Sequence, residues 1–182
     1  MVSDDSPEHQ YAAFISYRHV EPDRSWASWL HSALETYRVP KRLRAGTELP
    51  VRLGRVFRDE EELAASSHLS REIEDALQAS KWLIVVCSPR TPESRWVEKE
   101  VLRFRELGRE DRILALLIEG EPATSFPGPL QEIRDSCDTD EHSTADGALR
   151  EPLAADARSS RDEPLRQLRH VARLRILAPC LL

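Results

Sequence analysis

Glycine is scarce in this sequence, with six residues among 182. None of the six forms the G-x-G-x-x-G turn of dinucleotide-binding domains or the G-x-x-x-x-G-K-S/T loop of nucleoside triphosphatases. The acidic segment 138–149 opens like a calcium loop, but its sixth position is Ser143 rather than glycine. The six histidines show no paired spacing. We therefore expect no held cofactor and no metal site.

Long hydrophobic runs are also missing. The longest aliphatic run covers residues 113–118, whereas a helix that crosses a bilayer needs roughly 20 apolar residues. Residues 1–10 contain three carboxylates where a secretory signal requires a basic start and an apolar core. We therefore expect no membrane partner and a cytoplasmic location.

Cysteine and lysine occur only three times each. Cys87, Cys137 and Cys180 are odd in number and show no C-x-x-C spacing, so no disulfide framework or zinc knuckle is readable. Because Cys87 closes an apolar run, we expect it to be an inert core residue. The few lysines and the net charge of -6 argue against a nucleic-acid partner.

Strand and helix signals alternate along the chain. Short apolar runs indicate buried strands, and apolar residues spaced three and four apart indicate helices. Strands separated by single helices form parallel β-α-β units, so we expect an α/β fold with an open parallel sheet and helices on both faces. The expected strands cover residues 11–17, 52–57, 82–87 and 113–118, with a short fifth strand within 149–157, and the expected helices cover residues 26–37, 69–80, about 95–107 and 164–176.

The length of 182 residues suits one domain, and the balance of 40% hydrophobic and 32% charged residues is that of a compact chain. We expect residues 1–10 to be a flexible N-terminus and residues 11–178 to form the domain. Residues 131–150 are polar and acidic and are expected to form a mobile loop. The tail at residues 179–182 is apolar without a polar cap, which indicates truncation from a larger protein.

The helix expected at about 95–107 has one carboxylate in an unusual position. Glu100 lies inside its apolar arc, four residues after Trp96 and four before Phe104. A bare buried carboxylate costs several kcal/mol, so Glu100 must lie at a cleft edge, pair with a cation, or have a raised pKa. Two interpretations stay open at this point, a functional site and a structural ion pair.

Four short segments occur in a characteristic order. They are residues 14–18 (FISYR), residues 56–59 (VFRD) with Leu63 and Leu69 beyond them, residues 84–89 (IVVCSP), and residues 94–100 (SRWVEKE). Together they resemble a TIR (Toll/interleukin-1 receptor) domain of the bacterial type, with the best match over residues 11–120. The resemblance implies a flavodoxin-like sheet of about five parallel strands in the order 2-1-3-4-5.

The resemblance also implies an activity. Many TIR domains cleave NAD+ at the nicotinamide–ribose bond with a glutamate four residues after a tryptophan, and Glu100 and Trp96 match that pair. Glu100 is thus the expected catalytic residue, and NAD+ is a substrate rather than a cofactor. Breaking an N-glycosidic bond develops positive charge on the ribose, which a carboxylate stabilises. We expect Trp96 to belong to the substrate site, although its place on the apolar stripe favours packing.

Supporting residues follow from the ends of the strands. Ser16, Tyr17 and Arg18 end the first strand, where open α/β sheets bind ligands. Arg18 would hold the pyrophosphate or pair with an acid, and Tyr17 would stack on the substrate. Asp59 and Leu63 are assigned to the same substrate site, with capping of the following loop as the alternative for Asp59.

The resemblance implies partners as well. The segment 59–69 corresponds to a loop through which TIR domains contact one another, and this chain has alanines and serines at residues 64–67 where relatives often have glycine. The preferred interpretation is an NAD+ glycohydrolase of signalling or anti-phage defence that is activated by self-assembly and releases ADP-ribose or a cyclic isomer. The alternative is a non-catalytic adaptor that binds other TIR domains.

Overall fold

The central feature of the fold is a five-stranded, fully parallel sheet with the strand order β2-β1-β3-β4-β5. A computed structural model describes residues 9–58, 67–132, 153–158 and 164–181. The sheet confirms the expected α/β class and strand order. The strands are β1 (Tyr11–Ser16), β2 (Val56–Arg58), β3 (Ser80–Cys87), β4 (Ile113–Leu117) and β5 (Leu153–Asp156).

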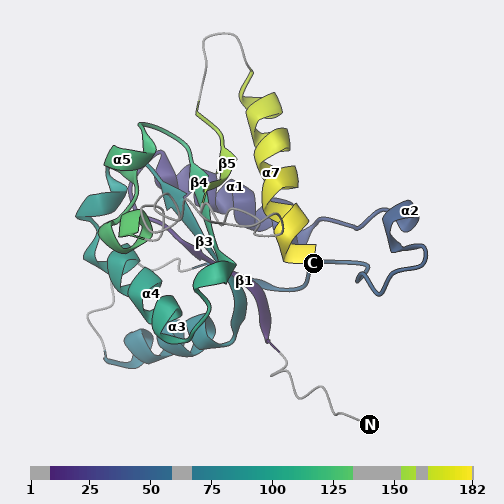
Figure 1. Ribbon diagram of the computed structural model, residues 1–182, viewed down its shortest axis with the longest axis horizontal. Coiled ribbons are helices and arrows are strands. Elements are labelled where there is room, and N and C mark those ends of the chain that lie inside the picture. The colour runs from purple at the N-terminus through teal and green to yellow at the C-terminus, as the bar shows by residue number, and fades with distance from the viewer. Residues whose placement is uncertain (1–8, 59–66, 133–152, 159–163, 182) are drawn as a thin grey trace, which may run out of the picture.

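Helices cover both faces of the sheet, as expected (Figure 1). Helices α1 and α7 lie on one face, and α3, α4 and α5 lie on the other. Among the residues described, no helix is long and apolar enough to cross a membrane. The helices are α1 (Asp23–Glu35), α2 (Lys41–Arg44), α3 (Ser67–Gln78), α4 (Arg95–Glu106), α5 (Pro122–Ser125) and α7 (Leu165–Leu181), with single 3-10 turns at Thr91–Glu93 and Glu110–Arg112.

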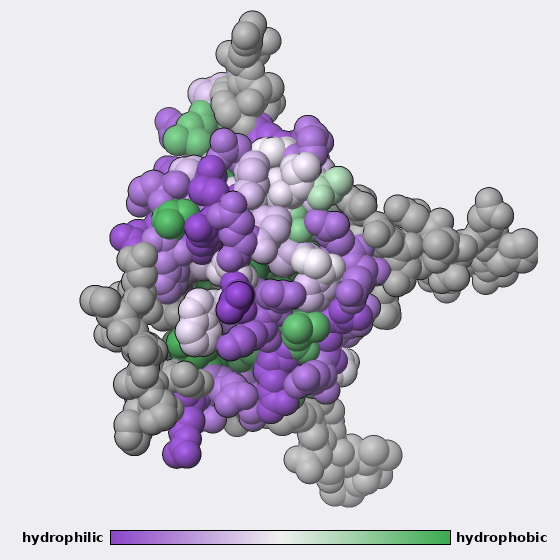
Figure 2. Space-filling model, turned by 90° about the vertical axis from the view of Figure 1, so that its left-hand side faces the viewer, coloured by the Kyte–Doolittle hydropathy of each residue, from purple (hydrophilic) through white to green (hydrophobic). Residues whose placement is uncertain are grey.

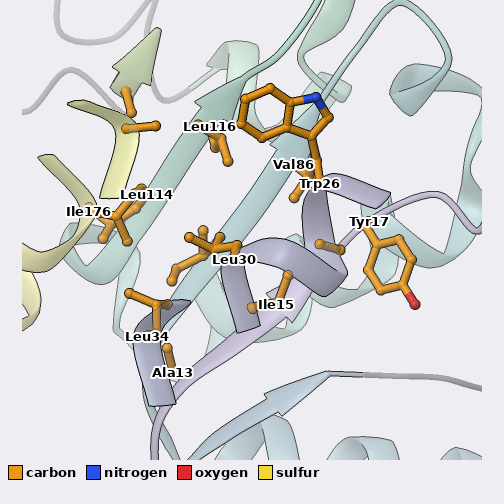
Figure 3. Close-up of a cluster of buried hydrophobic side chains, with 14 of the residues drawn as sticks. Ala13, Ile15, Tyr17, Trp26, Leu30, Leu34, Val86, Leu114, Leu116 and Ile176 are labelled. Atoms are coloured by element: carbon orange, nitrogen blue, oxygen red, sulfur yellow. The ribbon is translucent and has the colours of Figure 1, made fainter. Parts of the chain in front are cut away.

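The first core layer lies between the sheet and helices α1 and α7 (Figure 3). Leu30 of α1 lies near Ile15 of β1, Leu34 lies near Ala13, and Ile176 of α7 packs beside Leu114 of β4. All of these side chains are buried. Successive residues of a strand point to opposite faces, so Ala13 and Ile15 belong to this layer and Phe14 belongs to the other.

The second core layer joins the sheet to α3 and α4. Val97, Val101 and Phe104 form the buried stripe of α4, at the spacing of four and three residues that one helical face requires. Cys87 lies in the same layer, where burial raises the pKa of its thiol well above the usual value. The predicted core role of Cys87 is confirmed. Gly108, with a φ of +71°, follows α4 in the left-handed conformation that glycine adopts without strain.

Two expectations differ from the structure. The second strand is shorter than predicted, because Arg52 forms an antiparallel bridge with Arg38 and pairing with β1 begins only at Val56. The last helix also ends later than predicted, since α7 continues through Pro179 to Leu181 and Cys180 is buried in the core. Residues 1–8 and 133–152, which contain most of the expected flexible N-terminus and mobile loop, lie outside the described residues.

Truncation of the α4 core stripe tests this packing. Phe104→Ala removes a fully buried ring and should lower the free energy of unfolding by about 3–5 kcal/mol. Leu102→Ala on the exposed side of the same helix is the matched control and should cost less than about 1 kcal/mol. Urea unfolding followed by circular dichroism measures both. Equal losses would show that α4 does not pack on the sheet through Phe104.

Candidate functional site

The candidate site lies at the edge of the sheet where the parallel strands end. Ligands of open α/β sheets bind at this carboxyl edge, because the loops that leave the strands there meet in space. Residues 16–18 leave β1, residues 88–94 join β3 to α4, and Glu119 follows β4. Figure 2 shows the side of the molecule that carries α4 and α5, where isolated hydrophobic side chains stand in a mainly hydrophilic surface.

The Ser16 hydroxyl donates a hydrogen bond of 2.5 Å to Oε2 of Glu100. Ser16 ends β1 on the same face as Phe14, and α4 packs on that face. The side chain of Ser16 is therefore directed toward α4, and the residue is only 1% exposed. Glu100 is half-buried, one residue before Val101 of the buried stripe. The structure thus brings together two residues that the sequence separates by 84 positions.

Trp96 is not packed into the core, and the expectation from its place on the apolar arc is wrong. It is 59% exposed, and Nζ of Lys99 lies 5.1 Å from the centre of its ring. The buried stripe begins at Val97, so Trp96 falls at the border of the packed face. Residues four apart share a side of a helix, so the exposed ring lies one turn before Glu100. The tryptophan presents an aromatic surface beside the carboxylate.

The structure buries Tyr17 and pairs Arg18 with an acid. Tyr17 is buried in the layer on the α1 side of the sheet, its ring is 4.6 Å from that of His19, and its hydroxyl points away from the core cluster (Figure 3). Tyr17 thus contributes to the core, and its stacking on a substrate stays a prediction. Arg18 donates to the carboxylate of Glu93 at 2.5 Å and to the backbone oxygen of Arg90 at 2.9 Å. Of the two alternatives for Arg18, the structure contains the acid pair.

A buried carboxylate that sequence reasoning missed anchors the loop before α4. Asp23, at the start of α1, is 0% exposed and accepts hydrogen bonds from Ser88 Oγ at 2.8 Å and Arg90 Nη2 at 3.2 Å. Arg90 also donates to exposed Glu119 at 2.5 Å. Burial raises the pKa of Asp23, whereas the bonds from Ser88 and Arg90 oppose that rise. The only signal in the sequence is the polar run that follows the clearest strand.

This anchored loop sets the position of α4. Within it, Thr91 is buried, accepts from the backbone N–H of Ser88 at 2.8 Å, and donates to the oxygen of Val86 at 3.2 Å. The loop ends at Ser94, whose hydroxyl caps α4 by accepting from the N–H of Val97. Asp23 and Arg18 therefore hold, from two sides, the segment from which the helix bearing Glu100 starts.

Two of the predicted site residues lie outside the part of the chain that the structure describes. Asp59 and Leu63 lie outside the described residues, as does most of segment 59–69. Within the described ranges, no group of three or more histidine, cysteine, aspartate or glutamate side chains could hold a metal ion. The candidate site therefore consists of Glu100 with Ser16, the ring of Trp96, and the loop that positions them.

The chain is similar to several known proteins. A family model described as TIR domain matches residues 13–153. A curated relative, NAD(+) hydrolase ApTIR from an Actinoplanes species, is 33% identical over 168 residues, which are 88% of this chain and 21% of the relative. The chain thus spans about a fifth of that relative's length. Among solved structures, the TIR domains of the activated Roq1 resistosome, which recognises the pathogen effector XopQ, align with a TM-score of 0.43 and 19% identity, over 89% of this chain and 83% of that one.

Removal of each acid that Arg90 contacts tests the anchor. Asp23→Ala leaves two donors, the buried hydroxyl of Ser88 and the half-buried guanidinium of Arg90, without this acceptor, and should lower the free energy of unfolding by about 2–4 kcal/mol. Glu119→Ala removes an exposed partner of the same guanidinium and should cost less than about 1 kcal/mol. Urea titrations at neutral pH compare the two variants. A smaller loss for Asp23→Ala than for Glu119→Ala would contradict the anchoring role.

Proposed function

This chain belongs to the TIR domain family, and we propose that it hydrolyses NAD+ at the bond between nicotinamide and ribose. The observation that carries the proposal is the hydrogen bond from Ser16 to Glu100. It holds a half-buried carboxylate at the ligand-binding edge of the sheet, where a scaffold alone needs no acid. The relative named as an NAD(+) hydrolase supports the same activity, at 33% identity.

The chemistry needs one well-placed anion. As the bond between ribose C1′ and the nicotinamide nitrogen breaks, its electron pair leaves with nicotinamide, which becomes neutral, and positive charge develops on the ribose. The carboxylate of Glu100 stabilises that charge and accepts hydrogen bonds from ribose hydroxyls. Water then attacks C1′ and releases a proton, which gives ADP-ribose. Attack on C1′ by a nucleophilic group of the remaining ADP-ribosyl part, in place of water, gives a cyclic isomer.

Ser16 and Trp96 support this step in different ways. The Ser16 hydroxyl fixes the orientation of the Glu100 carboxylate before substrate arrives, so no reorganisation is needed during the reaction. The exposed ring of Trp96 offers a flat apolar surface on which the nicotinamide or adenine ring of the dinucleotide stacks. NAD+ enters as a substrate, and no bound cofactor takes part.

The biological setting proposed here is signalling or anti-phage defence in the cytoplasm. Copies of the domain assemble through segment 59–69, and assembly raises the activity.

Two glutamates on one helix provide the decisive comparison. Glu100→Gln keeps the size of the side chain but removes its charge, and should lower the rate of nicotinamide release by about 100-fold or more. Glu98→Gln, at an exposed position of α4, is the matched control and should retain the wild-type rate. The assay uses protein that is immobilised at high density, so that activation by assembly can occur, and NAD+ is added as the substrate. Equal rates in the two variants would remove Glu100 from the mechanism, and no release by wild-type protein would favour the adaptor.

The positioning role of Ser16 has its own test. Ser16→Ala removes the donor to Glu100 and should lower kcat about tenfold with little change in KM, because a charge-assisted hydrogen bond contributes about 1.4 kcal/mol or more. Ser25→Ala, on α1, removes an exposed hydroxyl that donates to Glu21 and should leave kcat unchanged. Steady-state kinetics with NAD+ separate the two parameters. An unchanged kcat for Ser16→Ala would mean that Glu100 is oriented without Ser16.

A further inference from the structure

Net positive charge is concentrated in two neighbouring elements of this structure. The first is the segment 38–55, called the arm below, which includes α2 and extends away from the sheet between α1 and β2 (Figure 1). The second is α7, which packs beside α1. The two elements are close where the guanidinium of Arg173 lies 5.8 Å from the centre of the ring of Tyr37, one residue before the arm. We call the arm and α7 together the basic face.

The arm is an ordered part of the fold. At its base, Arg38 and Arg52 form an antiparallel bridge, and the N–H of Val39 donates to the oxygen of Val51 at 3.0 Å. Val39 is buried at this point. The arm is therefore held in place relative to the domain.

The basic face carries a positive charge that the rest of the described structure lacks. The arm contains six cations and one carboxylate, and α7 contains four arginines and no carboxylate. The net charge of the two elements is thus +9, whereas all other described residues together have a net charge of -3. A surface with such an excess attracts anionic partners. The exposed cations are Arg38, Lys41, Arg42, Arg52 and Arg55 on the arm and Arg166 and Arg175 on α7.

Among the described residues, no cation of the basic face forms an ion pair with a carboxylate. Arg44 donates to the backbone oxygen of Val39 at 3.2 Å, and the guanidinium of Arg55 lies 5.3 Å from the centre of the ring of Tyr11. By contrast, Arg158 at the carboxyl edge of the sheet contacts two carboxylates. The charge of the basic face is therefore available to an external anion.

Exposed apolar side chains lie in the same two elements. On α7, Val171 and Leu174 are three residues apart and therefore share the side of the helix that faces away from the core. Exposed Arg175 follows Leu174 directly. The described chain has seven exposed large hydrophobic side chains, and five of them belong to the basic face: Leu43, Val51, Leu165, Val171 and Leu174. The basic face thus combines cations with most of the large hydrophobic side chains that are exposed.

This composition fits a lipid surface better than a nucleic acid or a protein. Neither element contains phenylalanine, tyrosine or tryptophan. Aromatic side chains stack on the bases of single strands, and they dominate protein–protein contacts, in which leucine and valine are under-represented. Arginine mixed with exposed aliphatic side chains is typical of segments that lie in the interface of a bilayer. The cytoplasmic leaflet of a membrane supplies the anionic headgroups that such cations bind.

We propose that the basic face docks on the surface of an anionic bilayer. Its cations bind headgroup phosphates, and Leu43 and Leu174 enter the boundary between headgroups and acyl chains. The expectation of no membrane partner rests on the lack of a run that could cross a bilayer, and a surface contact requires no such run. Helix α4, which bears Glu100, packs on the opposite face of the sheet, so the candidate site faces away from the bilayer. This docking goes beyond NAD+ cleavage and does not depend on it.

Sedimentation with vesicles tests the docking without NAD+. Vesicles of phosphatidylcholine with about 30% phosphatidylglycerol should bind the wild-type chain about tenfold or more tightly than vesicles of phosphatidylcholine alone. Arg42→Gln with Arg52→Gln removes two exposed cations of the arm and should weaken this binding about tenfold or more, because each cation near an anionic surface contributes about fivefold. Raising the salt from about 0.01 M to about 1 M should weaken wild-type binding about tenfold or more as well, because the screening length falls from about 30 Å to about 3 Å.

The apolar part of the contact has its own variant. Leu43→Ser with Leu174→Ser changes two exposed side chains and should weaken binding to the anionic vesicles about fivefold or more, because both side chains leave water on docking. A leucine variant that binds these vesicles like wild type would contradict the entry of the two side chains into the bilayer.

A matched variant separates the basic face from net charge. Arg71→Gln with Arg95→Gln removes the same charge from exposed positions of α3 and α4, on the other face of the sheet, and should leave vesicle binding within about threefold of wild type. Circular dichroism checks that all variants are folded. Wild-type protein that does not bind the anionic vesicles at low salt, or an arm variant that binds them like wild type, would overturn the proposal. Wild-type protein that binds a single-stranded oligonucleotide but not the vesicles would overturn it in favour of a nucleic acid.

Discussion

The hydrogen bond between Ser16 and Glu100 is the contact on which the account of this domain depends. It joins the last residue of β1 to the second turn of α4, across 84 residues of sequence. Its existence follows from two simple periodicities. The alternation of β1 directs Ser16 and Phe14 to the same face, and the stripe of α4 that packs on that face leaves Glu100 at its border. A half-buried carboxylate remains there because a hydroxyl satisfies it.

The loop between β3 and α4 positions the helix so that this contact forms. Asp23 of α1 and Arg18, two residues after β1, both reach the loop, so the start of α4 is fixed relative to the sheet rather than to its own chain neighbours alone. Burial of Asp23 destabilises its ionised form, and the hydrogen bonds from Ser88 and Arg90 offset that cost. The domain thus has a buried polar cluster at this position instead of apolar side chains.

Sequence reasoning predicted the parts of the fold that local patterns determine. Apolar runs gave the strands, helical spacing gave the major helices, and a single acid inside an apolar arc drew attention to Glu100. Sequence reasoning failed for contacts between residues that are far apart in the sequence. It also failed for a residue at the border of the apolar stripe of a helix. Asp23 and Arg90 meet only in three dimensions, 67 residues apart, and Trp96 was placed inside a stripe that begins one residue later. Arg52 was assigned to β2, but its backbone pairs with Arg38 instead.

The central claim is that the carboxylate of Glu100 contacts the ribose of NAD+. The most direct measurement is the carbon-13 NMR signal of that carboxyl group during titration with an NAD+ analogue whose nicotinamide–ribose bond cannot break, with Glu100→Gln used to assign the signal. The account predicts a saturable shift of the Glu100 signal while the signal of Glu98 stays in place. A protein saturated with the analogue in which the Glu100 signal does not move would contradict it.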